Sequence, residues 1–530
     1  MVAEKQLPRV QRECAGDVMR LPELPYELRP NKMEMVQMRG VNWSDALQDG
    51  DLRDSLNLSA RRWPYITTRK GRVKQSAYQN ATALTAWDKL VAVQGTSLLY
   101  DGETVGTVTA GKKQFAVVNT KMVIWPDKVY LDINDKSVKL LAAALTGSKA
   151  TFTKNKMTVS GWPDLTGYFK AGDGITISGC TSETGNNKDF VIKSVSAAEI
   201  TVADNTFTDA TEESTAIKLE RKIPDLDFIC ESENRLWGCN SQTQTIYASA
   251  LGDPTNFYVY EGLSTDAYTL AVGTEGKFTG CCKLSSSVLF WKETKLHKML
   301  GSYPAEYAMY TYEVEGLQAG CHKSQQVIND TLFYKGPHGV YAYSGGTPTL
   351  ISDNFGEKDF SDAVAGNDGD SYYLSVKDGE IRHLLVYETK TGIWVLEDST
   401  EAVDFARLGR SLYMLDGDGN VALLDGEDTP QTQEWMAQFA PMYETINGKK
   451  AYSKLMLRLE LPAGSYVIAK MRCDGKPWKE CGRVVGRECN VTSLRLAANR
   501  CDKFELRLEG KGPCTVLGIS REFIVGSDVK

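Results

Sequence analysis

The stretch CHKSQQVINDTLFYKGPHGVYAYSG, residues 321–345, decides the predicted fold. Its apolar runs at 327–328, 332–334 and 340–343 are separated by an Asn-Asp pair and by a Gly-Pro-His-Gly turn. Short runs of β-branched and aromatic residues between such turns are typical of antiparallel hairpins. The stretch therefore predicts two consecutive hairpins of a small antiparallel sheet.

Similar hairpin patterns recur along the chain, which indicates a repeat architecture. They lie at residues 83–100, 113–131, 227–251, 278–300, 372–397 and 403–424. Together with the first stretch they make about seven hairpin units, within the usual range for the blades of a β-propeller. We therefore predict an all-β fold built on a β-propeller. Because propellers host enzymes, binding modules and structural rings, the fold alone assigns no function.

The composition and the hydrophobic pattern of the sequence change at four places, and these changes predict the domain boundaries. Residues 1–58 are punctuated by prolines and are expected to form an extended N-terminal arm, with a disordered tail as the alternative. The propeller is expected to occupy 59–146 and 223–430. A Thr-, Lys- and Gly-rich segment at 147–222 is predicted to be a small inserted β-domain, and 431–530, with Leu alternating with charged residues, a two-sheet β-sandwich.

Composition excludes several classes of protein. The net charge of the 530 residues is -7, which argues against a general nucleic-acid-binding protein. The first 35 residues contain no apolar core of a signal peptide, and no run approaches the roughly 18 apolar residues of a membrane span. The 12 cysteines contain no C-x-x-C pair and are expected to be free thiols of a protein made in a reducing compartment.

Candidate catalytic and metal residues are few. The four histidines, His297, His322, His338 and His383, form no metal-binding motif. Cys321 beside His322 could form a nucleophile pair, but a buried structural cysteine is the favoured interpretation. The C-terminal cysteines are spaced too widely for a zinc site; they are Cys473, Cys481, Cys489, Cys501 and Cys514.

Asp416-Gly-Asp-Gly-Asn420 resembles the start of a calcium loop, with Glu427 at the twelfth position. Val421 replaces the glycine that the sharp turn of such a loop requires, so a hairpin turn is favoured. The sequence also lacks the S-x-D-x-G-x-T-W box of sialidase propellers, a nucleophile elbow and a phosphate-binding loop. We therefore predict no enzyme activity, and no catalytic, cofactor-binding or metal residues.

The most basic segment of the chain comprises Arg61, Arg62, Arg69, Lys70 and Arg72. Basic clusters of this kind usually form a solvated rim. The alternative is a contact with an acidic neighbour or with phosphate. The sequence leaves both interpretations open.

Two phrases of the sequence resemble virion proteins of tailed bacteriophages. The first is ENRLWGCN at 233–240 followed by IYASALGDPTNF at 246–257, and the second is RGVNWSD at 39–45 with LQDGD at 47–51. Both are similar to segments of the propeller-bearing nozzle, or hub, proteins of short-tailed phages. The resemblance covers about residues 40–430. Its motifs are typical of a propeller blade and do not indicate a position in the virion.

This resemblance implies a structural protein of the virion tail, synthesised in the host cytoplasm. Such proteins form a homo-oligomeric ring, commonly of about six copies, below the portal and adaptor and around the channel through which DNA is ejected. With a net charge of -7, we expect an acidic lumen along which DNA slides. Two alternatives remain: a tail-tip propeller that binds a host-surface glycan or protein, and a glycan-degrading enzyme with two facing carboxylates.

Overall fold

The computed structural model describes residues 30–212, 216–444, 446–497 and 500–525. Strands dominate these residues, and the only helices among them are short 3-10 segments. The prediction of an all-β fold is confirmed. The 3-10 segments are η1 (Leu165–Gly167), η2 (Thr184–Asn186), η3 (Pro304–Glu306), η4 (His322–Ser324) and η5 (Asp353–Phe355). Within the described part of the chain, no helix is long and apolar enough to cross a bilayer.

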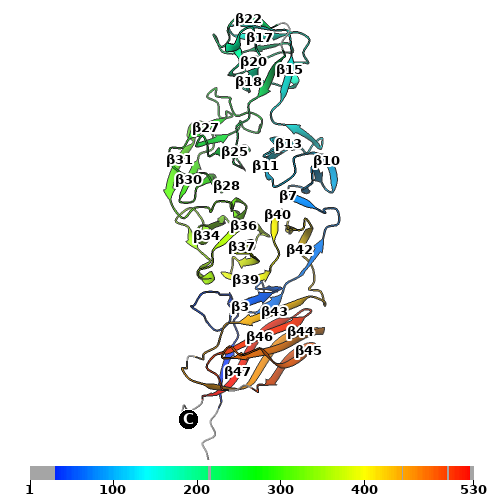
Figure 1. Ribbon diagram of the computed structural model, residues 1–530, viewed down its shortest axis with the longest axis vertical. Helices are drawn as coiled ribbons and strands as arrows, with labels where there is room; N and C mark the ends of the chain where they lie inside the picture. The colour runs from blue at the N-terminus through cyan, green and yellow to red at the C-terminus, as the bar shows by residue number, and fades with distance from the viewer. Residues whose placement is uncertain (1–29, 213–215, 445, 498–499, 526–530) are drawn as a thin grey trace, which may run out of the picture.

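Seven four-stranded antiparallel sheets form the middle of the molecule, where Figure 1 shows them placed around a ring. The first three sheets are β7–β10 (Ala81–Ala86, Leu90–Gln94, Ser97–Tyr100, Glu103–Thr107), β11–β14 (Gln114–Val118, Lys121–Trp125, Val129–Asp132, Ser137–Leu140) and β24–β27 (Phe228–Ser232, Arg235–Asn240, Thr245–Ala248, Tyr268–Ala271). The fourth and fifth are β28–β31 (Gly280–Leu284, Ser287–Trp291, Lys295–Leu300, Ala308–Glu313) and β32–β35 (Gln326–Ile328, Thr331–Gly336, Gly339–Tyr343, Thr349–Leu350).

The sixth sheet is β36–β39 (Phe360–Asn367, Ser371–Asp378, Ile381–Glu388, Ile393–Asp398). The seventh combines β40–β42 (Ala402–Leu408, Ser411–Asp416, Val421–Glu427) with β6 (Gly71–Lys74), which precedes the first sheet in the chain. Val73 of β6 lies opposite Leu423 of β42. A strand from the start of the ring thus completes its last sheet.

Hydrophobic packing closes the cycle of sheets. Each sheet shares an apolar cluster with the next, and the seventh shares one with the first, in which Leu415 packs with Leu84. A small sheet cannot bury both of its faces alone, so the alternating apolar positions of each blade-like unit need a neighbour on either side. This arrangement is β-propeller-like.

A separate β-domain lies between the second and third sheets, at the top of Figure 1. One of its sheets contains β15 (Ala144–Gly147), β18 (Gly174–Ser178), β19 (Asp189–Val191) and β23 (Ile217–Arg221). The other contains β16 (Ala150–Thr153), β17 (Lys156–Val159), β20 (Ser194–Val195), β21 (Glu199–Thr201) and β22 (Ala210–Glu212). The two sheets enclose their own core, which includes Phe152, Phe169 and Ile200. These bounds lie close to the predicted insertion at 147–222.

The C-terminal body, at the bottom of Figure 1, is one hydrogen-bonded sheet of ten strands. Its strands are β1 (Asn31–Met35), β2 (Gly40–Val41), β3 (Asp51–Leu56), β4 (Leu58–Ser59), β5 (Ile66–Thr68), β43 (Glu434–Phe439), β44 (Lys450–Cys473), β45 (Lys479–Arg495), β46 (Phe504–Lys511) and β47 (Thr515–Val525). We expected two separate sheets over 431–530. Instead, β44 pairs with β47 in its first half and with β46 in its second, and a register shift between Leu461 and Tyr466 marks the change.

Five strands of this body come from residues that we expected to form an N-terminal arm or the start of the propeller. β1 pairs with β47, β3 with β43, and β5 with β47. The apolar residues of this segment find their burial here, because Met35, Val41 and Leu52 join the core of the C-terminal body. Of the predicted arm at 1–58, residues 1–29 lie outside the described residues, and 30–58 belong to a folded domain. The ring begins only at β6, rather than at residue 59.

Candidate functional site

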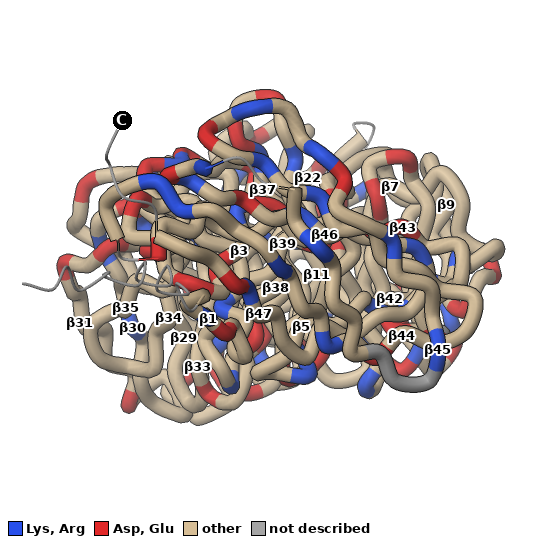
Figure 2. Tube along the Cα trace, turned by 90° about the horizontal axis from the view of Figure 1, so that it is seen from below, with Lys and Arg blue, Asp and Glu red and all other residues tan. Residues whose placement is uncertain are grey.

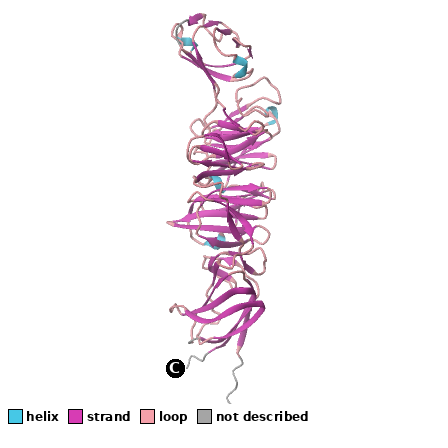
Figure 3. Cartoon of the chain, turned by 90° about the vertical axis from the view of Figure 1, so that its right-hand side faces the viewer, coloured by secondary structure: helices cyan, strands magenta, loops and turns pink. Residues whose placement is uncertain are grey.

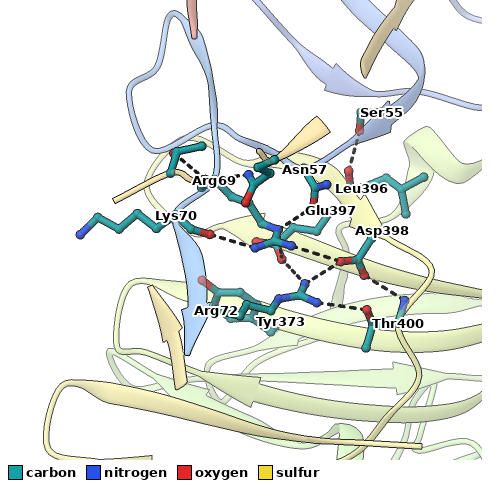
Figure 4. A network of polar contacts seen from close by, with 12 residues as sticks. Ser55, Asn57, Arg69, Lys70, Arg72, Tyr373, Leu396, Glu397, Asp398 and Thr400 are labelled. Atoms are coloured by element: carbon teal, nitrogen blue, oxygen red, sulfur yellow. Dashed lines mark hydrogen bonds and ion pairs between the residues drawn. The ribbon is translucent and has the colours of Figure 1, made fainter. Parts of the chain in front are cut away.

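The basic segment identified in the sequence lies where the C-terminal body meets the ring. Residues 58–68 belong to the C-terminal sheet and 71–74 to the seventh sheet of the ring, so the segment crosses from one body to the other. Arg61, Arg69 and Arg72 face the sixth sheet, whose last strand, β39, contacts β2, β3 and β4. We call Arg69, Arg72, Glu397 and Asp398 the arginine clamp (Figure 4).

Arg72 is the centre of the clamp. Its guanidinium lies 2.8 Å from a carboxylate oxygen of Glu397 and 2.8 Å from one of Asp398, and it donates a hydrogen bond to the Thr400 hydroxyl at 3.0 Å. Burial would lower the pKa of Arg72, but the carboxylates of Glu397 and Asp398 outweigh burial and raise it. Burial raises the pKa of Glu397 despite the two arginines. A desolvated carboxylate of this kind depends on its cationic partner.

Arg69 joins the clamp from the other side. Its Nε donates to the Asn57 side chain at 2.8 Å, and its guanidinium lies 3.7 Å from both Glu397 and Asp398. Burial and the neighbouring Arg72 lower the pKa of Arg69. Its carbonyl oxygen accepts bonds from Thr429 and Gln433, at the point where the chain re-enters the C-terminal body.

Backbone contacts reinforce the same junction. Ser55 donates to the carbonyl of Leu396 at 2.7 Å, and the Asn57 amide donates to the carbonyl of Glu397 at 2.6 Å (Figure 4). Gly40 has a φ of +80°, and a Cβ atom there would lie 2.2 Å from the carbonyl oxygen of Trp394. The backbone of β2 therefore approaches β39 as closely as only glycine permits. Arg69 and these contacts connect the C-terminal body to the ring, whereas Arg72 joins the seventh sheet of the ring to the sixth.

The other members of the basic segment also meet acidic residues. Arg61 forms ion pairs with Asp368 and Asp425, lies 3.7 Å from Glu388, and donates to the Tyr373 hydroxyl at 2.7 Å. Arg62 pairs with Glu460 at 2.5 Å, with both side chains about half exposed. Of the two interpretations of this segment, a contact with acidic neighbours is correct for its arginines, and the neighbours belong to the same chain. Sequence reasoning missed these partners because 68 acidic residues offered no way to choose among them.

Arg61 forms one wall of a crevice that has a volume of about 760 Å³. The crevice is also lined by Trp63 and by turns of the sixth and seventh sheets that contain Asp370, Lys390 and Arg410. Burial would lower the pKa of Arg61, but Tyr373 and the three carboxylates raise it. Burial raises the pKa of Glu388, whose side chain accepts a bond from the Ser371 hydroxyl at 2.9 Å.

A second cavity, of about 200 Å³, lies among the innermost strands of the ring. Lys323 pairs there with Asp404 at 2.8 Å, and Asp404 also accepts the Leu84 amide at 3.1 Å. His322 lines this cavity and lies against Phe228, with 5.2 Å between the ring centres; burial lowers its pKa to about 4. Cys321, by contrast, is buried in the core that the fifth sheet shares with the C-terminal body. The structure thus places these two sequence neighbours in different environments, which disfavours a Cys-His nucleophile pair.

The calcium-like segment and the cysteines have defined surroundings in the structure. Asp416 closes the turn between β41 and β42 by accepting the amides of Asp418 and Asn420 at 3.0 and 2.8 Å, so the calcium-like segment is a hairpin turn. The cysteine side chains that the structure describes are free thiols. Among the described residues, no group of three or more His, Cys, Asp or Glu side chains could hold a metal ion.

The residues of the phage-like phrase at 233–257 stabilise the third sheet. Arg235 is fully buried and donates to the carbonyl of Ser249 at 2.8 Å and to that of Ser264 at 2.5 Å. Trp237 and Phe257 are buried, and the Asp253 carboxylate accepts the Thr255 amide at 3.2 Å. These contacts hold the long connection between β26 and β27, so the phrase marks the architecture of one sheet.

Comparisons with known proteins find no relative in sequence. No protein-family model matches the chain, and the search of curated proteins gives no significant match. Solved structures with weak similarity include Kluyveromyces lactis Hsv2, with 10% identity and a TM-score of 0.28 over 60% of this chain and 97% of that one. They also include PorZ, a surface component of the type-IX secretion system of Porphyromonas gingivalis. It has 8% identity and a TM-score of 0.28 over 88% of this chain and 81% of that one. An exo-β-1,3-galactanase from Phanerochaete chrysosporium has 8% identity and a TM-score of 0.21, covering 54% and 92%. Similarity at this level assigns no function.

Proposed function

We propose that this chain is a structural, non-enzymatic subunit of a bacteriophage tail. In this proposal the seven sheets are the blades of a β-propeller that carries an inserted β-domain and a C-terminal β-domain. About six copies form a ring at the tail nozzle, beneath the portal and adaptor, and DNA passes through the ring during ejection. The phrases at 39–51 and 233–257, which resemble nozzle proteins, support this assignment.

The observation that carries the proposal is a pair of exposed edge strands toward opposite sides of the molecule. β31 is the outer strand of the fourth sheet, with Tyr310 and Tyr312 exposed by 49% and 46%. β45 pairs only with β44, and its Val485 and Val491 are exposed by 61% and 62%. Figures 1 and 2 show β31 and β45 toward opposite sides of the molecule, and in Figure 1 β31 lies in the ring and β45 lower, in the C-terminal body.

Two different surfaces on opposite sides are what a cyclic ring requires. In a ring each subunit contacts its neighbours head to tail, so one patch meets a different patch of the next copy. An exposed edge strand with apolar side chains is a natural template for pairing with another chain. The molecule is long and thin in Figure 3. Because β31 and β45 lie at different heights along it, neighbouring subunits must be tilted in the ring for the two edges to meet.

The arginine clamp supports the same proposal. In a subunit that holds a channel closed, the domains must keep fixed positions relative to one another. The buried pairs of Arg72 with Glu397 and Asp398 join the seventh sheet to the sixth, and the apolar core that the C-terminal body shares with the fifth and sixth sheets joins that body to the ring.

The test is the mass of the assembled protein after one edge is altered. Val485→Lys and Val491→Lys together place two charges on β45, and we expect the ring to dissociate into monomers in light-scattering measurements. Ile381→Lys is the matched control, because Ile381 is 60% exposed but lies at a hairpin of the sixth sheet. A ring that persists in the double variant contradicts the role of β45. If the ring is lost to the same extent in the Ile381→Lys control, any added surface charge disrupts it, and this result also contradicts a specific role of β45.

A further inference from the structure

The crevice beside Arg61 has the features of a ligand site that a purely structural subunit does not require. Its volume of about 760 Å³ lies within the range of small-molecule sites. One wall comes from the turn between β4 and β5 in the C-terminal body, with Arg61 and Trp63. The opposite wall comes from turns of the sixth and seventh sheets, at 368–370, 388–391 and 407–410.

The charges that line the crevice balance. The cations are Arg61, Lys390, Arg407 and Arg410, and the carboxylates are Asp368, Asp370, Glu388 and Asp425. Most are already paired, since Arg61 holds Asp368 and Asp425, and Lys390 lies 2.9 Å from Asp370. A balanced, internally paired lining favours a neutral ligand, because a charged one would leave part of the lining uncompensated.

The same lining offers hydrogen-bonding groups next to an apolar face. The Trp63 side chain is 44% exposed at the crevice, whereas Trp237 and Trp394, for example, are buried. Arg410 is exposed and has no ion-pair partner among the described residues, so its donors are available. Arg61 is held in place by its carboxylates and Tyr373, and needs no reorganisation when a ligand arrives.

We infer that this crevice binds a neutral saccharide. A sugar ring carries C–H groups on its face, which pack on an indole, and hydroxyls on its edge, which both donate and accept hydrogen bonds. Trp63 supplies the apolar platform, Arg410 the free donors, and the paired carboxylates, Asp370 above all, the acceptors. The class of ligand follows from this combination of an aromatic wall with a dense, neutral set of polar groups.

The test uses the full chain. The protein is first applied to an array that displays neutral hexose and N-acetylhexosamine oligosaccharides beside sialylated and sulfated ones. Maltohexaose, cellohexaose and chitohexaose are then titrated against the protein while the tryptophan fluorescence is recorded. We expect neutral glycans to bind. We expect the Trp63→Ala variant to bind them with an affinity at least about tenfold lower than that of the wild type.

Two further variants keep the test decisive. Arg410→Ala removes a side chain without an ion pair and is expected to fold normally and to weaken binding. Tyr260→Ala is the matched control, because Tyr260 is 55% exposed outside the crevice, and it should leave the affinity unchanged. No binding of any neutral glycan, binding of anionic glycans only, or full affinity in both crevice variants would overturn the inference.

Discussion

Arg72, which follows the C-terminal sheet's β5 in the chain, places its guanidinium 2.8 Å from the carboxylate of Glu397 on the last strand of the sixth sheet. The two residues are separated by 325 positions in the sequence. Arg72 belongs to β6 of the seventh sheet, so their buried ion pair joins the seventh sheet of the ring to the sixth, beside the place where the C-terminal body meets the ring.

Replacing Arg72 should therefore be costly. In Arg72→Ala, Glu397 stays buried without its closest cation, and we expect the free energy of unfolding to fall by about 3–5 kcal/mol. The half-exposed pair of Arg62 with Glu460 serves as the control, and Arg62→Ala should cost less than about 1 kcal/mol. Urea denaturation measures both. Equal losses in the two variants would mean that the buried pair of Arg72 with Glu397 stabilises the protein no more than an exposed ion pair does.

Gly40 gives a second test of the junction. Its φ is +80°, and a Cβ atom at this position would lie only 2.2 Å from the Trp394 carbonyl oxygen, so there is no room for a side chain. We expect Gly40→Ala to destabilise the protein by about 2–5 kcal/mol, from backbone strain and steric overlap together.

The matched control for this change is Gly95→Ala. Gly95 also has a positive φ, +59°, but no atom lies within 4 Å of the place that its Cβ would take. It should show the backbone cost alone, about 1–2 kcal/mol. Thermal unfolding monitored by circular dichroism compares the two, and a Gly40→Ala variant as stable as Gly95→Ala would contradict the close approach of β2 to β39.

The lowered pKa of His297 predicts that the folded protein loses stability in mild acid. Its ring nitrogens lie 2.9 Å from the hydroxyls of Thr274 and Thr311, and burial lowers its pKa to about 4, from an ordinary value of 6.5. Between these values the unfolded chain binds the proton and the folded chain does not, so stability is present above pH 6.5 and falls as the pH approaches 4. The shift corresponds to roughly 3 kcal/mol at most.

The measurement is the free energy of unfolding from pH 7 to pH 4. His297→Gln keeps a polar group between the two threonines but cannot take up the proton, so its stability should fall less across this range. His338→Gln, at an exposed histidine, should follow the wild type. A His297→Gln variant with the acid sensitivity of the wild type would show that other groups cause it.

The proposed channel should not retain DNA. The net charge is -7, and the arginines of the basic segment are occupied by carboxylates of the same chain. Figure 2 shows basic and acidic residues interspersed along the chain, with no continuous basic face in that view of the described residues. We expect no retention of double-stranded DNA at micromolar protein and about 0.15 M salt in a filter-binding assay. Tight, salt-dependent retention, or a lumen lined mainly by Lys and Arg, would contradict the expected acidic lumen.

Local patterns predicted much of this fold. Alternating apolar residues and Asn, Asp and Gly turns are local signals, and they located the hairpins of all seven sheets and the insertion. The pairing of β6 with β42, and of β1 and β5 with β47, could not be predicted in the same way. Strands of three to five residues carry almost no periodicity, and their partners lie hundreds of residues away.

In the candidate sites too, local features could be predicted from the sequence, and contacts between distant residues could not. The basic segment was visible in the sequence because five cations fall within 12 positions, 61–72. Its partners, Glu397 and Asp398, were not, since nothing local distinguishes them from other surface carboxylates. The exposure of Trp63 in a crevice could not be predicted either, because it depends on how the turn after β4 meets the sixth and seventh sheets.

The most direct test of the proposed function is the mass of the purified wild-type protein in solution, measured by light scattering with negative-stain images of the same sample. The account predicts a closed ring of about six subunits. A monomer at all accessible concentrations, with no rings in the images, would contradict a self-assembling tail subunit.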